Sequence, residues 1–214
     1  MGTVFADIST SLDGYVAGPD PTVEEPLGRG GEQLHEWAVA LASWRRPHGR
    51  EGGETGLDDD VMAATQARTA AVVMGRNMFG GGPGPWGEPA WNGWWGEEPP
   101  FHAPVFVLTH HPREPLEMQG GTTFTFVCDG IAAAVEQARG AADDGDVLVA
   151  GGASTVNQAL AAGLLDELHL HVAPVLLGAG ERLFEGLGEP PRLTLEGTLG
   201  ESGRVSHLRY RVER

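Results

Sequence analysis

Three short apolar runs that stop abruptly constrain the fold of this chain more than any other feature. They are "TAAVVMG" at 69–75, "PVFVLTH" at 104–110 and "DVLVAGG" at 146–152. Each run has the length of a buried strand and ends in glycine or in small polar residues. Helix-compatible stretches alternate with these runs along the chain. Strands that alternate with helices need crossover connections, which produce a mainly parallel sheet.

The remaining segments extend this pattern over the whole chain. Further strands are expected at 3–10, 122–128 and 166–178, and helices at 31–44, 58–68, 130–142 and 153–163. The tail is predicted to form a hairpin that turns around Glu201 to Gly203. The predicted fold is α/β, a three-layer α/β/α sandwich with a mainly parallel central sheet and antiparallel C-terminal strands. Because no repeat or linker interrupts the chain, residues 1–214 are expected to form a single domain.

Composition excludes several classes of partner. The chain has 214 residues and a formal net charge of −16, so nucleic acid and anionic membrane surfaces are not expected partners. The single cysteine, Cys128, cannot form a disulfide within the chain and is predicted to be a small buried residue. The N-terminal segment lacks the features of a signal peptide, and no stretch approaches the roughly 18 apolar residues of a membrane span. These features predict a cytoplasmic protein.

Two of the predicted strand ends suit a phosphorylated ligand. Gly151 and Gly152 separate a strand from a helix, which permits a tight turn and close approach of a ligand to the backbone. The first helical turn offers free N–H groups, the positive end of the helix dipole and the hydroxyls of Ser154 and Thr155. At the second of these strand ends, Arg76 directly follows the strand at 69–75 and carries a guanidinium that matches phosphate oxygens.

A third strand end, with Thr109 and His110, again places polar groups after an apolar run. Ligands of open α/β sheets bind outside the carboxyl ends of the strands, so the three ends predict one crevice. An extended ligand with more than one phosphate would suit it. Taken alone, each feature has a simpler interpretation, because glycine often precedes a helix and arginine is often a surface residue.

Five segments in order resemble one known family. They are "STSLDGYVAG", "VVMGRNMF", "VFVLTHHP", "VLVAGGASTVNQAL" and "DELHLHVAPVLLGAGERLF", and together they cover most of residues 1–187. In this order the chain resembles the dihydrofolate reductase superfamily, in the branch that includes the reductase domain of riboflavin biosynthesis. The resemblance implies an α/β/α sandwich, NADPH as the hydride donor and a homodimer. It also implies a small acceptor substrate that is heteroaromatic or carries a C=N or C=O bond.

The resemblance further implies which residues would bind the coenzyme. The phosphate region would meet Gly75, Arg76, Asn77 and Met78. The adenosine 2′-phosphate would lie near Thr109 and His110. The pyrophosphate would lie against Gly151, Gly152, Ala153, Ser154, Thr155 and Val156, and the nicotinamide would border Val16 and Ala17. Hydride transfer needs no protein nucleophile, so the protein would supply position, electrostatics and a proton donor.

Two aspartates are candidates for catalysis. Asp7 shares one face of the first strand with Phe5 and Ser9, and in similar proteins this face lines the substrate site. Burial there is expected to raise the pKa of Asp7 into a useful range. Asp13 in "SLDG" matches a family position, although aspartate before glycine is also an ordinary turn residue. Glu32 and Glu36 on the following helix are further possible acids.

Other features leave alternatives open. Four tryptophans crowd the segment 80–103, which is expected to be an irregular loop that acts as a lid, a hydrophobic plug or a dimer interface. His169 and His171 alternate on one strand face and, with His207, could hold a metal, although packing in the sheet is the favoured interpretation and no metal is expected. The alternatives to a reductase are therefore a non-catalytic NADP(H)-binding sensor and a metal-dependent hydrolase.

Overall fold

One mixed β-sheet organises the computed structural model, which describes residues 2–82 and 84–213. Over those residues the sheet has nine strands in the order β10-β11-β8-β1-β7-β3-β4-β6-β5. The strands are β1 (Val4–Ser11), β3 (Thr69–Gly75), β4 (Pro104–Leu108), β5 (Leu116–Glu117), β6 (Thr123–Val127), β7 (Asp146–Gly151), β8 (Glu167–Ala173), β10 (Arg192–Glu201) and β11 (Ser206–Glu213). The strands from β8 to β6 run parallel, whereas the pairs β10–β11, β11–β8 and β5–β6 are antiparallel.

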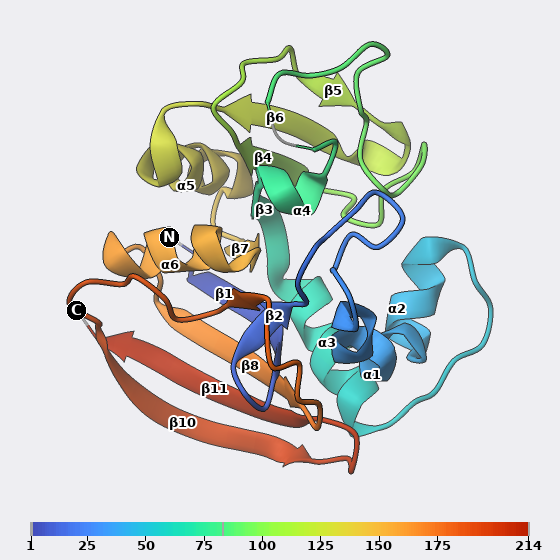
Figure 1. Cartoon of the computed structure of the whole chain (residues 1–214), viewed down its shortest axis with the longest axis vertical. Coiled ribbons are helices and arrows are strands. Elements are labelled where there is room, and N and C mark those ends of the chain that lie inside the picture. Colours follow the sequence, from blue (N-terminus) through green and yellow to red (C-terminus); the bar gives the residue numbers. More distant parts are fainter. Residues whose placement is uncertain (1, 83, 214) are drawn as a thin grey trace.

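Helices cover both faces of this sheet (Figure 1). The helices are α1 (Glu36–Val39), α2 (Ala42–Arg45), α3 (Leu57–Arg68), α4 (Arg76–Phe79), α5 (Gly130–Ala142) and α6 (Ala153–Ala161). Short 3-10 turns are η1 (Gly31–His35), η2 (Arg46–His48) and η3 (Gln119–Gly121). Helices α5 and α6 lie together on one face, and α1, α2 and α3 lie on the other (Figure 1). The α/β sandwich with a mainly parallel sheet and antiparallel C-terminal strands, predicted from the sequence, is confirmed.

Side chains of the central strands alternate between the two faces, as the period of a strand requires. Val73 packs in the large apolar cluster with Ala138 of α5 and Val156 of α6. The next residue, Met74, points to the opposite face and packs in a second cluster with Phe79 of α4. Burial of each such side chain contributes about 1.5–3 kcal/mol relative to exposure. Runs that are apolar on both faces are therefore central strands of a covered sheet.

The expected helix at 31–44 is wrong as a continuous element. The chain forms η1, α1 and α2 there, and Leu41 between α1 and α2 adopts an extended conformation. Leu41 forms an isolated bridge with Glu54, and the N–H of Ala42 donates to the carbonyl of Glu54 at 2.9 Å. This local pairing interrupts the helix although the apolar spacing favours one.

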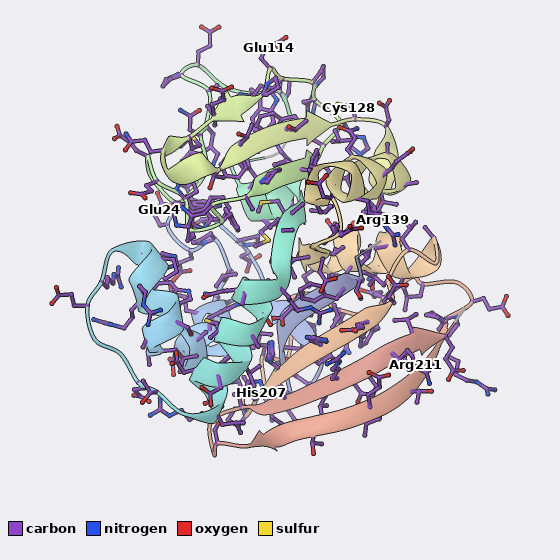
Figure 2. The ribbon with its side chains drawn as sticks, turned by 180° about the vertical axis from the view of Figure 1, so that it is seen from behind. Glu24, Glu114, Cys128, Arg139, His207 and Arg211 are labelled. Atoms are coloured by element: carbon purple, nitrogen blue, oxygen red, sulfur yellow. The ribbon has the colours of Figure 1, made fainter. Side chains whose placement is uncertain are left out.

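Three other expectations need correction. Strand β8 ends at Ala173, before Pro174, which lacks the N–H needed to continue a ladder. Cys128 follows the end of β6 and is exposed rather than buried (Figure 2). A small second sheet, β2 (Tyr15–Ala17) paired with β9 (Glu181–Arg182), lies in segments expected to be loop or strand end. None of the helices in the described ranges is long and apolar enough to cross a membrane.

Candidate active site

The carboxyl ends of neighbouring parallel strands meet at one edge of the sheet. Gly75 at the end of β3 pairs with Leu108 at the end of β4, and Leu108 pairs with Val127 at the end of β6. On the other side of β3, Met74 pairs with Gly151 of β7. The predicted convergence of these strand ends is confirmed by this register. In open α/β sheets this edge is where ligands bind.

The junction between β7 and α6 is built on two glycines. Gly151 has a φ of 122°, the peptide between Gly151 and Gly152 is cis, and Gly152 is the N-cap of α6. The N–H of Thr155 donates to the carbonyl of Gly152 at 3.1 Å. A Cβ added at Gly75 would lie 2.4 Å from Thr155 Oγ1, so β3 can approach α6 only with glycine at that position. The end of β3 and the start of α6 therefore form one continuous edge of the crevice.

Arg76 begins α4 directly after Gly75, and its side chain has no acidic partner among the described residues. Its guanidinium lies over the ring of Trp86, with Cζ 3.6 Å from the ring centroid. Nη2 donates to the carbonyl of Gly81 at 3.4 Å, but Nε and Nη1 are buried and have no hydrogen-bond partner within the described residues. Burial and the positive charge of Arg113 both lower the pKa of Arg76. Unpaired buried donors are costly, so this arginine is poised for an anion.

Arg113 is a second cation at the same place, and the sequence reasoning missed it. Its Cζ lies 5.1 Å from the centroid of the Trp86 ring, so one indole contacts both guanidinium groups. Its Nη2 donates to Asn92 Oδ1 at 2.7 Å, and Nη1 donates to the carbonyl of Trp91. Burial lowers the pKa of Arg113. Its position in the turn after β4, close behind Thr109, was the only available signal in the sequence.

The other predicted phosphate contacts divide into exposed and buried groups. The exposed side chains are those of Asn77, His110 and Ser154, and Met78 is half-buried. The buried ones are Thr109, Ala153, Thr155 and Val156. The Thr109 hydroxyl accepts a hydrogen bond from the N–H of His111 at 3.2 Å, so it shapes the turn after β4.

The residues predicted to border the nicotinamide pair with a strand that carries a carboxylate, which the sequence analysis did not predict. Val16 is buried and Ala17 half-buried in β2, and Ala17 pairs with Glu181 of β9. A Cβ placed on Gly152 would lie 3.7 Å from Glu181 Oε2. This carboxylate therefore lies beside the first turn of α6, where the helix dipole favours negative charge.

Asp7 is placed where it was expected but with a different electrostatic character. Its carboxylate contacts His171 Nε2 at 2.8 Å, accepts from the Thr65 hydroxyl at 2.8 Å and lies 3.5 Å from His169 Nδ1. Burial raises the pKa of Asp7, but the charge and hydrogen bonds of the two histidines outweigh it and hold this pKa well below 3.8. The expected raised pKa is wrong, because partners from distant segments surround the carboxylate. An ionised Asp7 is a hydrogen-bond acceptor and no proton donor near neutral pH.

Asp13 organises the loop after β1. Its Oδ1 accepts from the Ser11 hydroxyl at 2.6 Å, and its two oxygens accept from the N–H groups of Leu177 at 3.1 Å and Gly178 at 2.8 Å. The hydrogen bond from Ser11, followed by those from the backbone, lowers the pKa of Asp13 to about 2. These bonds use the carboxylate to join two loops, in keeping with the turn interpretation.

The three histidines form a hydrogen-bonded cluster and not a metal site. His171 Nδ1 lies 2.6 Å from His207 Nδ1, and their Nε2 atoms contact Asp7 and Asp58. Two nitrogens that both coordinated one metal at about 2.0 Å could not approach each other so closely. Among the described residues no group of three or more histidine, cysteine, aspartate or glutamate side chains could hold a metal ion.

The tryptophan-rich segment 80–103 packs against the sheet. Trp86 and Trp95 lie against the aromatic cluster around Phe79 and Phe124. The indole N–H groups of Trp91 and Trp94 donate to the carbonyls of Phe79 and Met78 at 2.9 and 3.1 Å. These contacts favour the hydrophobic plug among the three interpretations, with Trp86 also providing the ring beneath Arg76.

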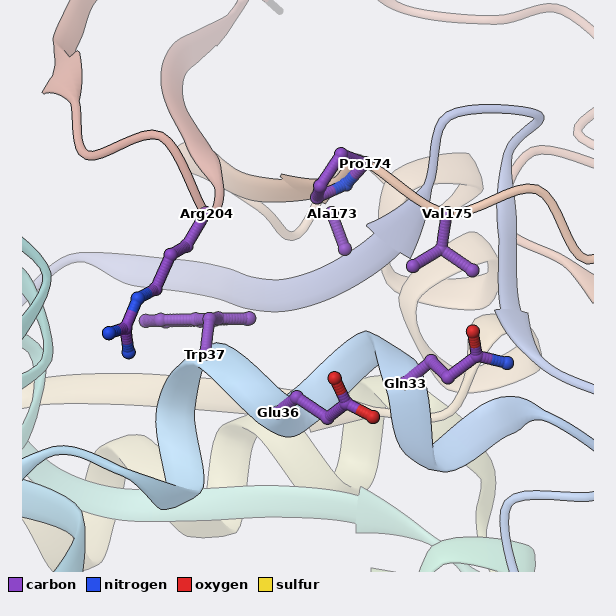
Figure 3. A pocket seen from close by; sticks show the side chains of 7 residues that line it. All are labelled: Gln33, Glu36, Trp37, Ala173, Pro174, Val175 and Arg204. Carbon is purple, nitrogen blue, oxygen red and sulfur yellow. The ribbon is translucent and has the colours of Figure 1, made fainter.

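A pocket opens on the other side of β1 from the glycine junction. Its cavity volume is about 350 Å³, and its lining residues are Gln33, Glu36, Trp37, Ala173, Pro174, Val175 and Arg204. Figure 3 shows Gln33, Glu36 and Trp37 on the helical wall, opposite the segment that follows β8. Strand β1 separates this pocket from the crevice, because β1 lies between β8 and β7 in the sheet. The pocket combines the aromatic ring of Trp37 with the carboxyl group of Glu36 and the guanidinium of Arg204.

Solved structures of similar proteins share the fold. A protein from Shewanella sp. PV-4 named for riboflavin biosynthesis is 20% identical, with a TM-score of 0.67 and 100% of both chains covered. A diaminohydroxyphosphoribosylaminopyrimidine deaminase/5-amino-6-(5-phosphoribosylamino)uracil reductase from Thermotoga maritima is 16% identical, with a TM-score of 0.59 over 99% of this chain and 57% of that one. RibD from Acinetobacter baumannii is 15% identical, with a TM-score of 0.56 over 100% of this chain and 58% of that one.

The present chain thus spans a little more than half of the length of the Thermotoga and Acinetobacter proteins. No curated protein matches the sequence. The family model described as the RibD C-terminal domain matches residues 2–202, which is nearly the whole chain. The resemblance recognised in the five ordered segments is therefore confirmed, and the chain belongs to the RibD C-terminal domain family.

Proposed function

We propose that this protein is an NADPH-dependent reductase that transfers hydride to a small substrate carrying a heteroaromatic ring or a C=N or C=O bond. Membership of the RibD C-terminal domain family supports the reductase class. The main observation in favour of this coenzyme concerns Arg76. Its Nε and Nη1 are buried and have no hydrogen-bond partner within the described residues. An unpaired guanidinium at a convergent edge of strands, in a chain of net charge −16, favours a phosphate group as its partner.

The residues at this edge fit a dinucleotide diphosphate with an additional phosphate. Arg76 and Arg113 would hold the phosphate on the adenosine, with Thr109 and His110 nearby. The first turn of α6, after Gly151 and Gly152, would hold the pyrophosphate through N–H groups. The carboxylate of Glu181 opposes this arrangement, since it lies beside Gly152. When bound, NADPH supplies the hydride, and the residues described here bind and orient it.

The pocket beyond β1 is proposed as the site of the acceptor substrate. It lies on the side of β1 away from the crevice, so the end of β1 and the β2 residues Val16 and Ala17 would lie between the two ligands. Trp37 provides a flat apolar surface for a ring. Glu36 lines the pocket with a carboxyl group that can accept a hydrogen bond from a ring N–H of the substrate. Because the pKa of Asp7 is held low, Asp7 is not assigned the role of proton donor.

A titration with NADPH, followed by tryptophan fluorescence, tests the coenzyme site. Trp86 lies directly on Arg76, so we expect a signal change on binding. Arg76→Ala should weaken NADPH binding by about tenfold or more, because a charge-assisted hydrogen bond is lost. Arg211→Ala is the matched control, since Arg211 is exposed, pairs with Glu196 at 3.3 Å and lies on β11, which strands β8 and β1 separate from β7. Equal losses in both variants, or none in Arg76→Ala, would contradict the proposal.

A sensor that binds NADP(H) without turnover is the second candidate. It predicts the same titration result but no oxidation of NADPH across a panel of heteroaromatic and carbonyl substrates. The homodimer implied by the resemblance also stays a proposal, supported by exposed Leu193 and Leu195 on the edge strand β10. Light scattering of the purified protein would measure its mass directly.

A further inference from the structure

Four side chains from four elements form a buried row beneath the substrate pocket. Asp58 of α3 contacts His207 Nε2 at 3.0 Å, and His207 Nδ1 contacts His171 Nδ1 at 2.6 Å. His171 Nε2 in turn contacts Asp7 Oδ1 at 2.8 Å. His171 and His207 are 4% and 1% exposed, so water cannot replace these contacts. His207 lies between β11 and α3 (Figure 2).

Counting hydrogen atoms along this row gives a definite result. Each of its three contacts needs one hydrogen, and an ionised carboxylate can only accept. Two neutral imidazoles carry one N–H each, so together with two carboxylates they supply two hydrogens for three contacts. Without a third, the lone pairs of His171 Nδ1 and His207 Nδ1 would face each other at 2.6 Å. The geometry therefore requires one additional proton in the row.

The contacts of the two rings limit where this hydrogen can lie. His171 Nε2 faces Asp7 and His207 Nε2 faces Asp58, so the third hydrogen lies between the two Nδ1 atoms. Burial is the main cause that lowers the pKa of His207, which favours a neutral His207 whose Nδ1 accepts. His171 then donates from both ring nitrogens, to Asp7 and to His207.

Other charged groups face this pair from every element packed against it. They are Asp7 of β1, His35 of η1, Asp58 and Arg68 of α3, Glu167 and His169 of β8 and Arg209 of β11. Arg68 and Arg209 are both bound to Glu167, at 2.9 and 2.8 Å, which limits the positive charge that they direct at His171. Asp7 is the acidic group in direct contact with His171.

The row is connected to three walls of the pocket. The ring of Trp37 lies 5.0 Å from His171 and 5.2 Å from His207, and its Nε1 donates to Ser9 Oγ at 3.2 Å. His171 is followed on β8 by the lining residue Ala173, and His207 follows the lining residue Arg204 closely at the start of β11. A change in the contact between the two histidines would therefore move all three walls.

We propose that Asp58, His207, His171 and Asp7 share three protons and that the extra proton positions Trp37 in the wall of the pocket. His171 and His207 are positioning residues in this scheme, because neither lines the pocket. As pH rises and the extra proton is lost, the Nδ1–Nδ1 contact opens and Trp37 shifts. The consequence for substrate binding rests on the proposed function, whereas the proton count does not.

Nuclear magnetic resonance of protein labelled with ¹⁵N in histidine and tryptophan tests this count without coenzyme or substrate. We expect His171 to show two protonated ring nitrogens and His207 one bonded hydrogen with an accepting Nδ1. When the pH is raised, loss of the shared proton should shift both rings and the Trp37 indole N–H together. Two singly protonated rings at every pH at which the protein stays folded would overturn the proposal.

Variants separate positioning from simple structural support. His207→Gln can still bond to Asp58 and His171 but cannot share an imidazole proton, so its Trp37 signal should no longer titrate with His171. His102→Gln is the control, since His102 is exposed and its ring forms a hydrogen bond with the carbonyl of Gly120 at 2.8 Å, away from the row. Thermal unfolding checks that both variants fold. An unchanged Trp37 titration in folded His207→Gln would overturn the proposal, and so would unfolding of that variant together with singly protonated rings in the wild type.

Failure of this test is distinguishable from failure of the proposed function. The nitrogen resonances report on the apoprotein, and the NADPH titration reports on Arg76 at the other side of β1. A correct proton count with no NADPH binding would keep the positioning inference and reject the reductase. NADPH binding together with two singly protonated rings would keep the reductase proposal and reject the shared proton.

Discussion

On one face of the sheet, α5 and α6 meet the strands through alanine, valine and leucine side chains; on the other, α3 meets them through charged and polar groups. Helix α3 contributes Asp58 to His207 at 3.0 Å and Thr65 to Asp7 at 2.8 Å. Its last residue, Arg68, binds Asp146 at 2.6 Å. The free energy contributed by apolar contacts depends on the buried area, whereas that of these polar contacts depends on the protonation of the groups. The two faces should therefore respond differently to pH.

The largest effect is expected from Asp7→Asn on the polar face. Removing the charge leaves His171 and its neighbours buried without compensation, which should cost about 3–5 kcal/mol of unfolding free energy near neutral pH. The pKa of Asp7 is lowered in the folded state, so its contribution is present above 3.8 and is lost as pH falls below it. Urea unfolding near neutral pH and near pH 2 should thus show a smaller penalty in acid. A penalty independent of pH would contradict the charge argument.

On the apolar face the corresponding change is Leu165→Ala. Leu165 is fully buried in the cluster beneath α5 and α6. The lost contacts and the cavity should cost about 2–5 kcal/mol. The same two urea titrations should give equal losses at both pH values, because no titratable group is removed. A marked pH dependence here would show that the two faces are not independent.

His35 is expected to make the stability of the polar face depend on pH in the acid range. Its pKa is lowered to about 4 by burial and by His171, so the folded protein binds fewer protons than the unfolded chain between pH 6.5 and 4. Stability should fall as pH falls through that window, by up to roughly 3 kcal/mol. His35→Gln should flatten this slope in thermal unfolding measured across the window. A slope unchanged from wild type would exclude His35 as its source.

The smallest effect is expected on coenzyme binding in the crevice at the carboxyl ends of the strands. Glu181→Gln removes the carboxylate beside Gly152 and should strengthen NADPH binding several-fold, since charges at a helix N-terminus contribute about 0.3–1 kcal/mol. Glu189→Gln, in an exposed segment, is the matched control. Weaker binding in Glu181→Gln would show that this carboxylate contacts the ligand favourably.

The sequence predicts the apolar face and the crevice well because their signals are local. The run "TAAVVMG" is apolar on both faces, and its abrupt end at Gly75 marks the strand end beside α6. The glycine pair at 151 and 152 likewise marks the start of α6. The hydrophobic period and the positions of glycine are sufficient to predict such elements from the sequence. The family resemblance rests on these same segments.

The polar face could not be predicted in the same way because its partners are distant in sequence. The pKa of Asp7 depends on His171 and His169, which are more than a hundred positions away, and local burial alone suggested the opposite direction. Leu41 similarly leaves the helical pattern because it pairs with Glu54. Arg113 matches no local pattern, because only the folded chain brings it to the same Trp86 ring as Arg76. Tertiary contacts, and not propensities, decide these cases.

Parallel titrations with NADPH and NADH test the central claim most directly. The claim is that Arg76 and Arg113, which share the ring of Trp86, hold the phosphate that distinguishes the two coenzymes. The account predicts that NADPH binds at least about tenfold more tightly than NADH and that Arg113→Ala weakens this preference. Equal affinity for both coenzymes, unchanged in Arg113→Ala, would contradict it.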